Sequence, residues 1–224
     1  MSSQKLYRWS GIVLLIGSLP GVIGSILSFV LYPGHTLTAQ QVLSTPFTIA
    51  AFLFLAWSLL LAMSLPGLYL RQAKRARALG FVQLSLGVLL GGVVFAGVQA
   101  TIYPYMAQSA PKLLPSGGTG PDAGFLLWIL GPTFLLGIGA ILLGIGSRRA
   151  QVFPRWTGTL LIISGVLFLL AIPPIPSPFG DIIDLASNGV FFVALAWCGY
   201  QLMTQQQETA EAVARPATEA GVSR

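Results

Sequence analysis

Long apolar runs separated by short polar stretches recur along the whole chain. Each run is close to the roughly 20 residues that an α-helix needs to cross the hydrocarbon core of a bilayer. No Lys, Arg or Glu interrupts any of them. We therefore expect an all-α membrane bundle of six transmembrane helices, at residues 9–31, 47–70, 79–103, 124–146, 156–173 and 182–203.

Basic residues gather in alternate gaps between these runs, and the gaps on the other side hold only Lys112. Because Lys and Arg are enriched in cytoplasmic loops, this alternation predicts that both termini are cytoplasmic. The first run is too long for a signal peptide and lacks a small-x-small cleavage site, so we expect it to remain as a span. The expected topology determinants are Lys5, Arg8, Arg71, Lys74, Arg75, Arg77, Arg148, Arg149 and Arg155.

The composition favours lipid as the solvent of most of the chain. Hydrophobic residues make up 54% of the 224 residues and charged residues 8%, against about 25% charged residues in soluble proteins. The mean hydropathy is +0.80. A formal charge of +6 would indicate nucleic-acid binding in a soluble protein. Here the basic residues are spread over the gaps, so we expect no nucleic-acid partner. Residues 1–203 form the predicted membrane domain, and residues 204–224 a polar cytoplasmic tail that is disordered or loosely helical.

Aromatic residues that carry a polar group fall mostly at the predicted span ends, where an amphipathic ring is stable at the membrane interface. Trp57 and Trp197 lie deeper and require a packed position or a hydrogen-bond partner. The residues expected at the interfaces are Tyr7, Tyr32, Tyr69, Tyr103, Tyr105, Tyr200, Trp9, Trp128 and Trp156.

A short basic motif recurs at the predicted cytoplasmic start of three spans. Arg-Trp-Ser-Gly at 8–11 returns as Arg-Trp-Thr-Gly at 155–158, and a degraded copy, Arg-Ala-Leu-Gly, stands at 77–80. One interpretation is three parallel copies of an out-and-back helical hairpin. The other is independent origin, because an Arg, an interfacial ring and a small residue each suit the start of a membrane helix.

Small residues four positions apart recur within the spans. In lipid, such pairs let two helix backbones approach closely. Their main expected use is packing inside the bundle, and the alternative is self-association of the protein. The pairs are Gly17 with Gly21, Gly87 with Gly91, Gly92 with Ala96, and Ala140 with Gly144. Pro20, Pro66 and Pro132 are predicted to kink their helices.

Strongly polar side chains inside the spans are few, and they are the candidate site residues. Gln83, Gln99 and Asn188 are expected either to form interhelical hydrogen bonds or to line a small polar pocket. Asp184 lies one turn into the sixth span. With Asp181 it fits a helix N-terminus, where a carboxylate caps free amides, and the alternative is a proton- or cation-handling role.

The chain lacks the residues that most cofactor and metal sites require. It has one cysteine, Cys198, and one histidine, His35. Neither a disulfide nor a His- or Cys-based metal centre can be built from them, so we expect no metal, no cofactor and no catalytic residue. His35 is expected to be an exposed loop residue, and Cys198 a small packing residue. Acid–base chemistry needs positioned titratable groups, so a membrane enzyme is disfavoured.

Two segments carry a resemblance to known proteins. In GSRRAQVFPRWTGTLLIISGVLFLL, residues 146–170, a basic turn with Pro-Arg-Trp leads into an apolar helix. The other segment is RWSGIVLLIGSLPGVIGSIL, residues 8–27. Both are similar to parts of uncharacterised bacterial six-span integral membrane proteins, which are grouped as domains of unknown function. The resemblance implies a six-helix bundle in the bacterial cytoplasmic membrane and brings no catalytic residues.

These features together predict a multi-pass protein with a non-enzymatic role in binding or assembly. The expected partners are membrane lipids, other membrane helices or a second copy of the chain. The alternative is a small transporter or channel for a neutral or weakly polar solute, with its site among Gln83, Gln99, Asp184 and Asn188.

Overall fold

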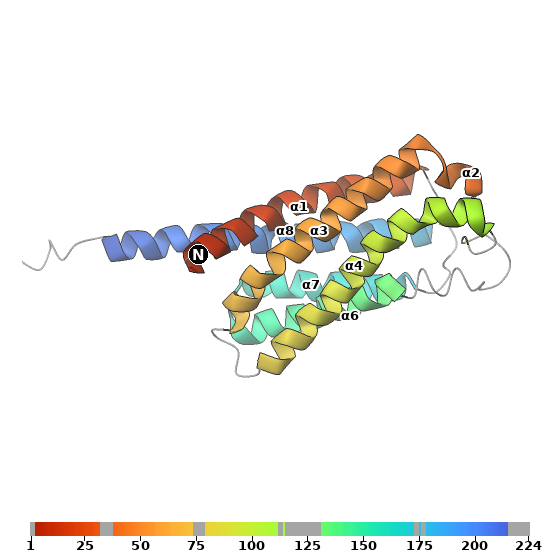
Figure 1. Cartoon of the computed structure of the whole chain (residues 1–224). Helices are drawn as coiled ribbons and strands as arrows, with labels where there is room; N and C mark the ends of the chain where they lie inside the picture. Colours follow the sequence, from red (N-terminus) through yellow and green to blue (C-terminus); the bar gives the residue numbers. More distant parts are fainter. Residues whose placement is uncertain are drawn as a thin grey trace, which may run out of the picture.

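The computed structural model describes residues 3–31, 38–73, 79–111, 114, 131–172, 175 and 178–214, with side chains described from residue 5 to residue 204 within these ranges except that of Leu79. In this part of the chain all regular structure is helical (Figure 1). The helices are α1 (Ser3–Leu31), α2 (Ala39–Val42), α3 (Thr45–Ala73), α4 (Leu79–Ser109), α6 (Gly131–Ala150), α7 (Arg155–Leu170) and α8 (Phe179–Ala214).

Five of these helices are long and apolar enough to cross a membrane: α1, α3, α4, α6 and α8. Helix α7 is apolar but only 16 residues long. It ends at Leu170, three residues before the predicted end of the span 156–173, and the proline-rich sequence 173–178 follows it. Residues 124–130, the predicted start of the fourth span, lie outside the described residues.

Two features at helix ends bear on the sequence-based expectations. Helix α8 continues to Ala214, so the start of the predicted tail follows the helical one of its two alternatives. The segment that follows the span is rich in Gln, Glu and Ala, which favour helix. Pro132 stands in the first described turn of α6, next to residues 124–130, which lie outside the described part of the chain. Pro20 and Pro66 do lie inside α1 and α3.

The long helices form a closed ring. Each packs on its neighbours in chain order, and α8 returns to pack on α1, so the order around the ring is α1, α3, α4, α6, α7, α8. Neighbouring helices run in opposite directions (Figure 1). One end of the bundle therefore holds the starts of α1, α4 and α7 and the ends of α3, α6 and α8.

The interior of the ring is filled with aromatic and aliphatic side chains. Trp57 is 3% exposed and meets Phe192 edge to face, with ring centroids 5.5 Å apart. Phe191 packs in the same way on Phe168 at 5.6 Å. The buried position predicted for Trp57 is thus confirmed, although its indole N–H has no acceptor among the described residues.

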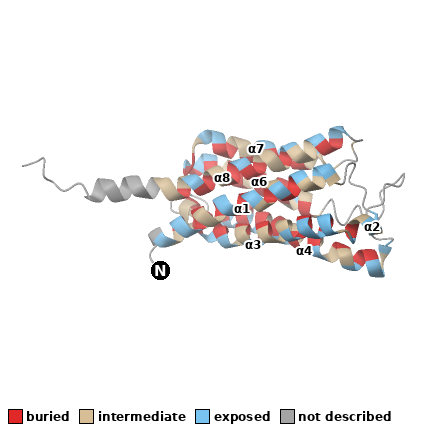
Figure 2. Cartoon of the chain, turned by 90° about the horizontal axis from the view of Figure 1, so that it is seen from above, coloured by how far each residue is buried: buried red, intermediate tan, exposed pale blue. Residues whose placement is uncertain are grey.

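The outer surface of the ring is apolar as well. Leu19, Phe52 and Met63 are 61%, 65% and 67% exposed. Figure 2 shows exposed and buried residues in alternation along the helices, because residues that face outward alternate with residues that face the interior of the ring. A large exposed apolar surface is unfavourable in water. The described helices therefore present an outer surface that suits a membrane protein.

Glycines set the closest helix contacts. In the α6–α7 hairpin, Gly144 faces Gly158 and Gly137 faces Gly165. A Cβ atom on Gly144 would stand 2.6 Å from the carbonyl oxygen of Gly158, and one on Gly165 2.5 Å from that of Gly137. Gln151, with φ of 48°, adopts the left-handed conformation directly after the end of α6. Close backbone contact thus joins α6 and α7 at two levels, one at Gly144 and Gly158 and the other at Gly137 and Gly165.

The predicted small-residue pairs do not all mediate close contacts between helices. Gly17 faces Leu60 of α3, whereas Gly21 faces Phe192 of α8, so this pair serves two different neighbours. Gly87 has no described atom within 4 Å of where a Cβ would stand, and Gly91 has only Leu135, at 3.8 Å. The pair Gly87–Gly91 therefore does not mediate close packing inside the described bundle.

Candidate functional site

The serine hydroxyls inside the bundle are bonded mainly within their own helices. Ser18 donates to the carbonyl of Leu14 at 2.8 Å, and Ser64 to that of Leu61 at 2.7 Å. Ser58 also reaches another helix and bonds the carbonyl of Val93 in α4 at 2.9 Å. Such bonds satisfy a hydroxyl where water is absent, so these serines act in packing.

Gln83 lies one turn into α4 on its exposed face. Its Nε2 donates to the hydroxyl of Tyr69 in α3, at a long distance of 3.4 Å. The bond links the end of α3 to the start of α4. Gln83 therefore makes the interhelical contact that the sequence predicts as one of its two uses.

Gln99 lies near the other end of the same helix. Its Nε2 donates to the hydroxyl of Tyr103, one turn further on, at 2.7 Å. Tyr103 is buried and meets Phe47 edge to face at 5.8 Å, so this tyrosine, expected near an interface, packs inside the bundle. Sixteen positions separate Gln83 from Gln99, which is about 24 Å along an α-helix. The two amides do not share a pocket.

Asp184 and Asn188 are close together on α8. The Nδ2 of Asn188 donates to the carbonyl oxygen of Asp184 at 2.9 Å and to its Oδ1 at 3.3 Å. Asp181, in the first turn of α8, is buried. The carboxylates thus lie in the first two turns of a helix, where its positive dipole end favours negative charge. Both are at the end of the ring opposite to Gln83.

Gln72, which sequence analysis does not single out, is the most buried amide in the described part of the chain. It lies in the last turn of α3, is 0% exposed, and donates from Nε2 to the Ser147 hydroxyl of α6 at 2.9 Å. Its Oε1 has no partner among the described residues. In the sequence it follows Arg71 just past an apolar run, so it resembles an exposed residue of a loop.

All described Lys and Arg side chains lie at one end of the ring, which we name the basic end. Arg149 also stacks over the ring of Phe81, with 5.9 Å between its Cζ and the centroid. The described carboxylates, Asp181 and Asp184, lie at the opposite end. The predicted determinants Lys74, Arg75 and Arg77 fall outside the described residues, as does His35. The basic end is defined by Lys5, Arg8, Arg71, Arg148, Arg149 and Arg155.

A row of aromatic rings joins α7 and α8 at the basic end. Trp156 and Trp197 have ring centroids 4.7 Å apart, and Trp197 and Tyr200 5.4 Å apart. Trp156 and Tyr200 are exposed. Trp197 thus has the packed position that the sequence predicts as one of its two requirements. Its indole N–H has no acceptor in the described region.

The hollows of the described surface include one at each end of the ring. One, of about 470 Å³, is lined by Lys5, Arg8, Trp9 and Ile12 at the basic end of α1.

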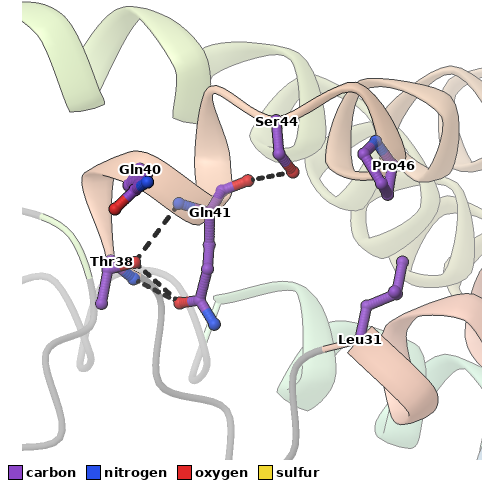
Figure 3. A pocket seen from close by; sticks show the side chains of 6 residues that line it. All are labelled: Leu31, Thr38, Gln40, Gln41, Ser44 and Pro46. Carbon is purple, nitrogen blue, oxygen red and sulfur yellow. Dashed lines mark hydrogen bonds between the residues drawn. The ribbon is translucent and has the colours of Figure 1, made fainter.

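The second hollow, of about 310 Å³, lies at the opposite end and is shown in Figure 3. It is lined by Leu31, Thr38, Gln40, Gln41, Ser44 and Pro46.

The polar groups of the second hollow are largely bonded to one another. Gln41 Oε1 accepts from the backbone N–H and the hydroxyl of Thr38, both at 2.9 Å, and Ser44 donates to the carbonyl of Gln41 at 2.6 Å (Figure 3). This arrangement is the capping box of α2. It holds the corner between α1 and α3 and leaves few polar groups for a ligand.

The described residues contain no group of three His, Cys, Asp or Glu side chains that could hold a metal ion. Cys198 is buried in α8, in the packing position expected for it. The remaining exposed charge is the cationic charge of the basic end. Comparison of the chain with models of protein families, with curated proteins and with solved structures finds no match.

Proposed function

We propose that this chain is a six-span, non-enzymatic protein of the bacterial cytoplasmic membrane, whose role is to bind lipids or partner helices through its outer surface. The observation that carries the proposal is the state of the polar side chains. Gln83, Gln99 and Asn188 each donate a hydrogen bond to a nearby protein group, and the space between the helices is filled by rings such as Trp57 and Phe192. A solute pathway would need polar groups aligned across the bundle.

In this proposal α7 is the sixth crossing. Its 16 residues extend over about 24 Å, somewhat less than the hydrocarbon thickness. Its glycine contacts with α6 and its packing on α8 support a crossing antiparallel to both. Short helices are accommodated in bilayers by local thinning. The basic end then faces the cytoplasm, and so do both termini.

Cysteine labelling in intact cells and in inverted vesicles tests the topology. Cys198 is 1% exposed and gives little background. We expect Lys5→Cys and Arg149→Cys to react from the cytoplasmic side and Phe179→Cys, which replaces a 70% exposed residue, from the other side. Labelling of Arg149→Cys and Phe179→Cys from the same side would show that α7 does not cross the membrane.

Reconstitution in liposomes tests the binding role against transport. We expect the flux of protons and of small neutral solutes to equal that of protein-free liposomes. Flux that is abolished by Asp184→Asn or Asn188→Leu would overturn the proposal in favour of a transporter whose site includes the contact between these two side chains. Flux that survives both substitutions would also overturn the binding role, and would place the pathway elsewhere.

A further inference from the structure

Four side chains of different chemistry share one face of α1 at the basic end. Lys5, Arg8, Trp9 and Ile12 are spaced i, i+3, i+4 and i+7, which places them on one stripe of the helix. Together they line the hollow of about 470 Å³, whose wall is almost wholly apolar. Leu14 is on the opposite face and is buried in the core. The stripe therefore faces away from the bundle.

The order of these side chains along the helix matches the order of groups in a phospholipid. The two cations come first, the indole follows, and the aliphatic side chain lies deepest. Lys5 and Ile12 are seven residues apart, or about 10 Å along the helix axis. A phosphate, a glycerol with its ester groups, and the start of an acyl chain follow one another over a comparable distance. Indole rings prefer the level of the ester groups.

The neighbouring helices place this stripe at the level of the membrane interface. Gly11 contacts Gly199, where a Cβ on either residue would stand 2.7 Å from the carbonyl oxygen of the other. Tyr200, next to Gly199, therefore lies near the level of Trp9. Together with Trp156 and Trp197 it forms the aromatic row described above. Such rings mark the boundary between headgroups and hydrocarbon.

The charge of the stripe has no protein counterpart in the described part of the chain. The described carboxylates, Asp181 and Asp184, begin α8 at the far end of the ring. Lys5 and Arg8 are exposed, and Trp9 is 60% exposed. A free phosphate ion would use the cations alone and would leave the indole and the aliphatic side chain uncovered. A lipid covers all four.

We propose that this stripe binds one anionic phospholipid, with its phosphate on Lys5 and Arg8 and its glycerol and acyl chain along Trp9 and Ile12. The inference rests on the proposed function, since it assumes that the basic end lies at a membrane interface, and it names the class of lipid bound. The lipid is a ligand of the outer surface, so its binding does not depend on the absence of a transport pathway.

Titration of the purified full chain with phosphatidylglycerol, followed by native mass spectrometry, tests the site. Each basic residue near an anionic lipid surface contributes enough to change the affinity about fivefold. We expect Lys5→Gln with Arg8→Gln to weaken binding of the first phosphatidylglycerol about 25-fold. Lys5→Arg with Arg8→Lys keeps the charges and should retain the affinity, which separates a loss of charge from a loss of folding.

The matched control is Arg148→Gln with Arg149→Gln, which removes two exposed cations from the same end of the ring. We expect it to leave the first binding constant within about twofold. The proposal would be overturned in favour of diffuse attraction to the basic end if both pairs of substitutions weakened binding equally. It would also be overturned if neither pair weakened binding. Displacement of the lipid by inorganic phosphate at equal concentration would also overturn it, because the hollow would then be a site for the ion alone.

This test and the liposome flux assay have separate outcomes. Flux in liposomes would refute the binding role and leave the lipid measurement standing. A lipid affinity that does not depend on Lys5 and Arg8 would refute the lipid site and leave the flux result unchanged.

Discussion

Gly87 and Gly165 occupy matching positions when the chain is aligned with itself at an offset of 78 residues. Their surroundings nevertheless differ. A Cβ on Gly165 would stand 2.5 Å from the carbonyl oxygen of Gly137, a backbone atom that cannot move without shifting α6. Gly87 has no described neighbour within 4 Å of that position. Only one of the two positions therefore requires glycine for packing.

We predict opposite outcomes for the same substitution at these two positions. Gly165→Ala should lower the free energy of unfolding by about 1–2 kcal/mol, because the added methyl group forces α6 and α7 apart. Gly87→Ala should leave it unchanged or raise it by up to about 1 kcal/mol, since alanine favours helix and meets no neighbour. Unfolding by SDS titration in mixed micelles measures both. Equal losses would contradict the close contact between α6 and α7.

Sequence reasoning identifies most of the deep polar residues but not how they are arranged. Gln83, Gln99, Asp184 and Asn188 stand out because they interrupt apolar runs. Their partners lie three to fourteen positions away, as Tyr69 does from Gln83, and which side chain is in reach depends on helix rotation and packing. Gln72 is missed for the opposite reason. It lies beyond its apolar run, and only the approach of α6 buries it.

At the scale of elements, the apolar runs predict the helices well and their ends less well. The predicted span 47–70 corresponds to α3, Thr45–Ala73, and the span 79–103 to α4, which continues to Ser109. The extension of α4 contains Met106 and Ala107, which pack with Val42 of α2. Helix ends are set by such tertiary contacts and by caps, whereas an apolar run reports only the part of the helix that lies in hydrocarbon.

The motif that recurs at three helix starts does not make the same contacts in each place. Among the three Arg-x-x-Gly copies, Gly11 packs on α8 and Gly158 on α6, each against the preceding helix of the ring, while Gly80 has no described neighbour within 4 Å. At the seam between α3 and α4, Ser58 and Gly97 make the close contact instead. The contacts of α8 with α1 and of α6 with α7 therefore use the glycine of the motif, whereas the contact of α3 with α4 does not.

The bond between Gln72 and Ser147 ties α3 to α6, two helices that are not neighbours in the ring. We predict that Ser147→Ala lowers the free energy of unfolding by about 1–2 kcal/mol, because it leaves the whole buried amide of Gln72 without a partner. Gln72→Met should be milder. It keeps the volume and removes the buried polar group, and the Ser147 hydroxyl can turn to a carbonyl of its own helix.

The double variant completes this test. Ser147→Ala combined with Gln72→Met should unfold at nearly the same free energy as Gln72→Met alone, because the alanine then deprives no polar group of its partner. Additive losses in the same SDS titration would mean that the two side chains do not interact.

At the scale of the whole molecule, the direction of each helix can be predicted from the sequence, but the closure of the ring cannot. Alternating basic gaps predict that the first and last spans run in opposite directions. They do not predict that these two spans touch. Contact between α1 and α8 arises because Gly11 and Gly199 let the two backbones meet. Nothing in the sequence distinguishes these two glycines from Gly80, Gly87 and Gly189, which have no described neighbour within 4 Å of where a Cβ would stand.

Closure of the ring makes a definite prediction for distances between spin labels. Because Gly11 lies against Gly199 in antiparallel helices, Lys5 is close in register to Thr204. Helix axes in contact are about 8–10 Å apart, so labels at Lys5→Cys and Thr204→Cys should lie within about 25 Å of each other. Phe179, at the other end of α8, is 25 residues before Thr204, or about 38 Å along the helix.

Double electron–electron resonance in lipid vesicles, with Cys198→Ala as background, measures both pairs. The pair Lys5→Cys with Phe179→Cys should give a distance above about 35 Å, because one label is at the basic end and the other at the opposite end. A long distance for Lys5 with Thr204 would mean that α1 and α8 are separated and the ring is open. A short distance for Lys5 with Phe179 would mean that α8 runs parallel to α1, which would also contradict a basic end shared by the start of α1 and the end of α8.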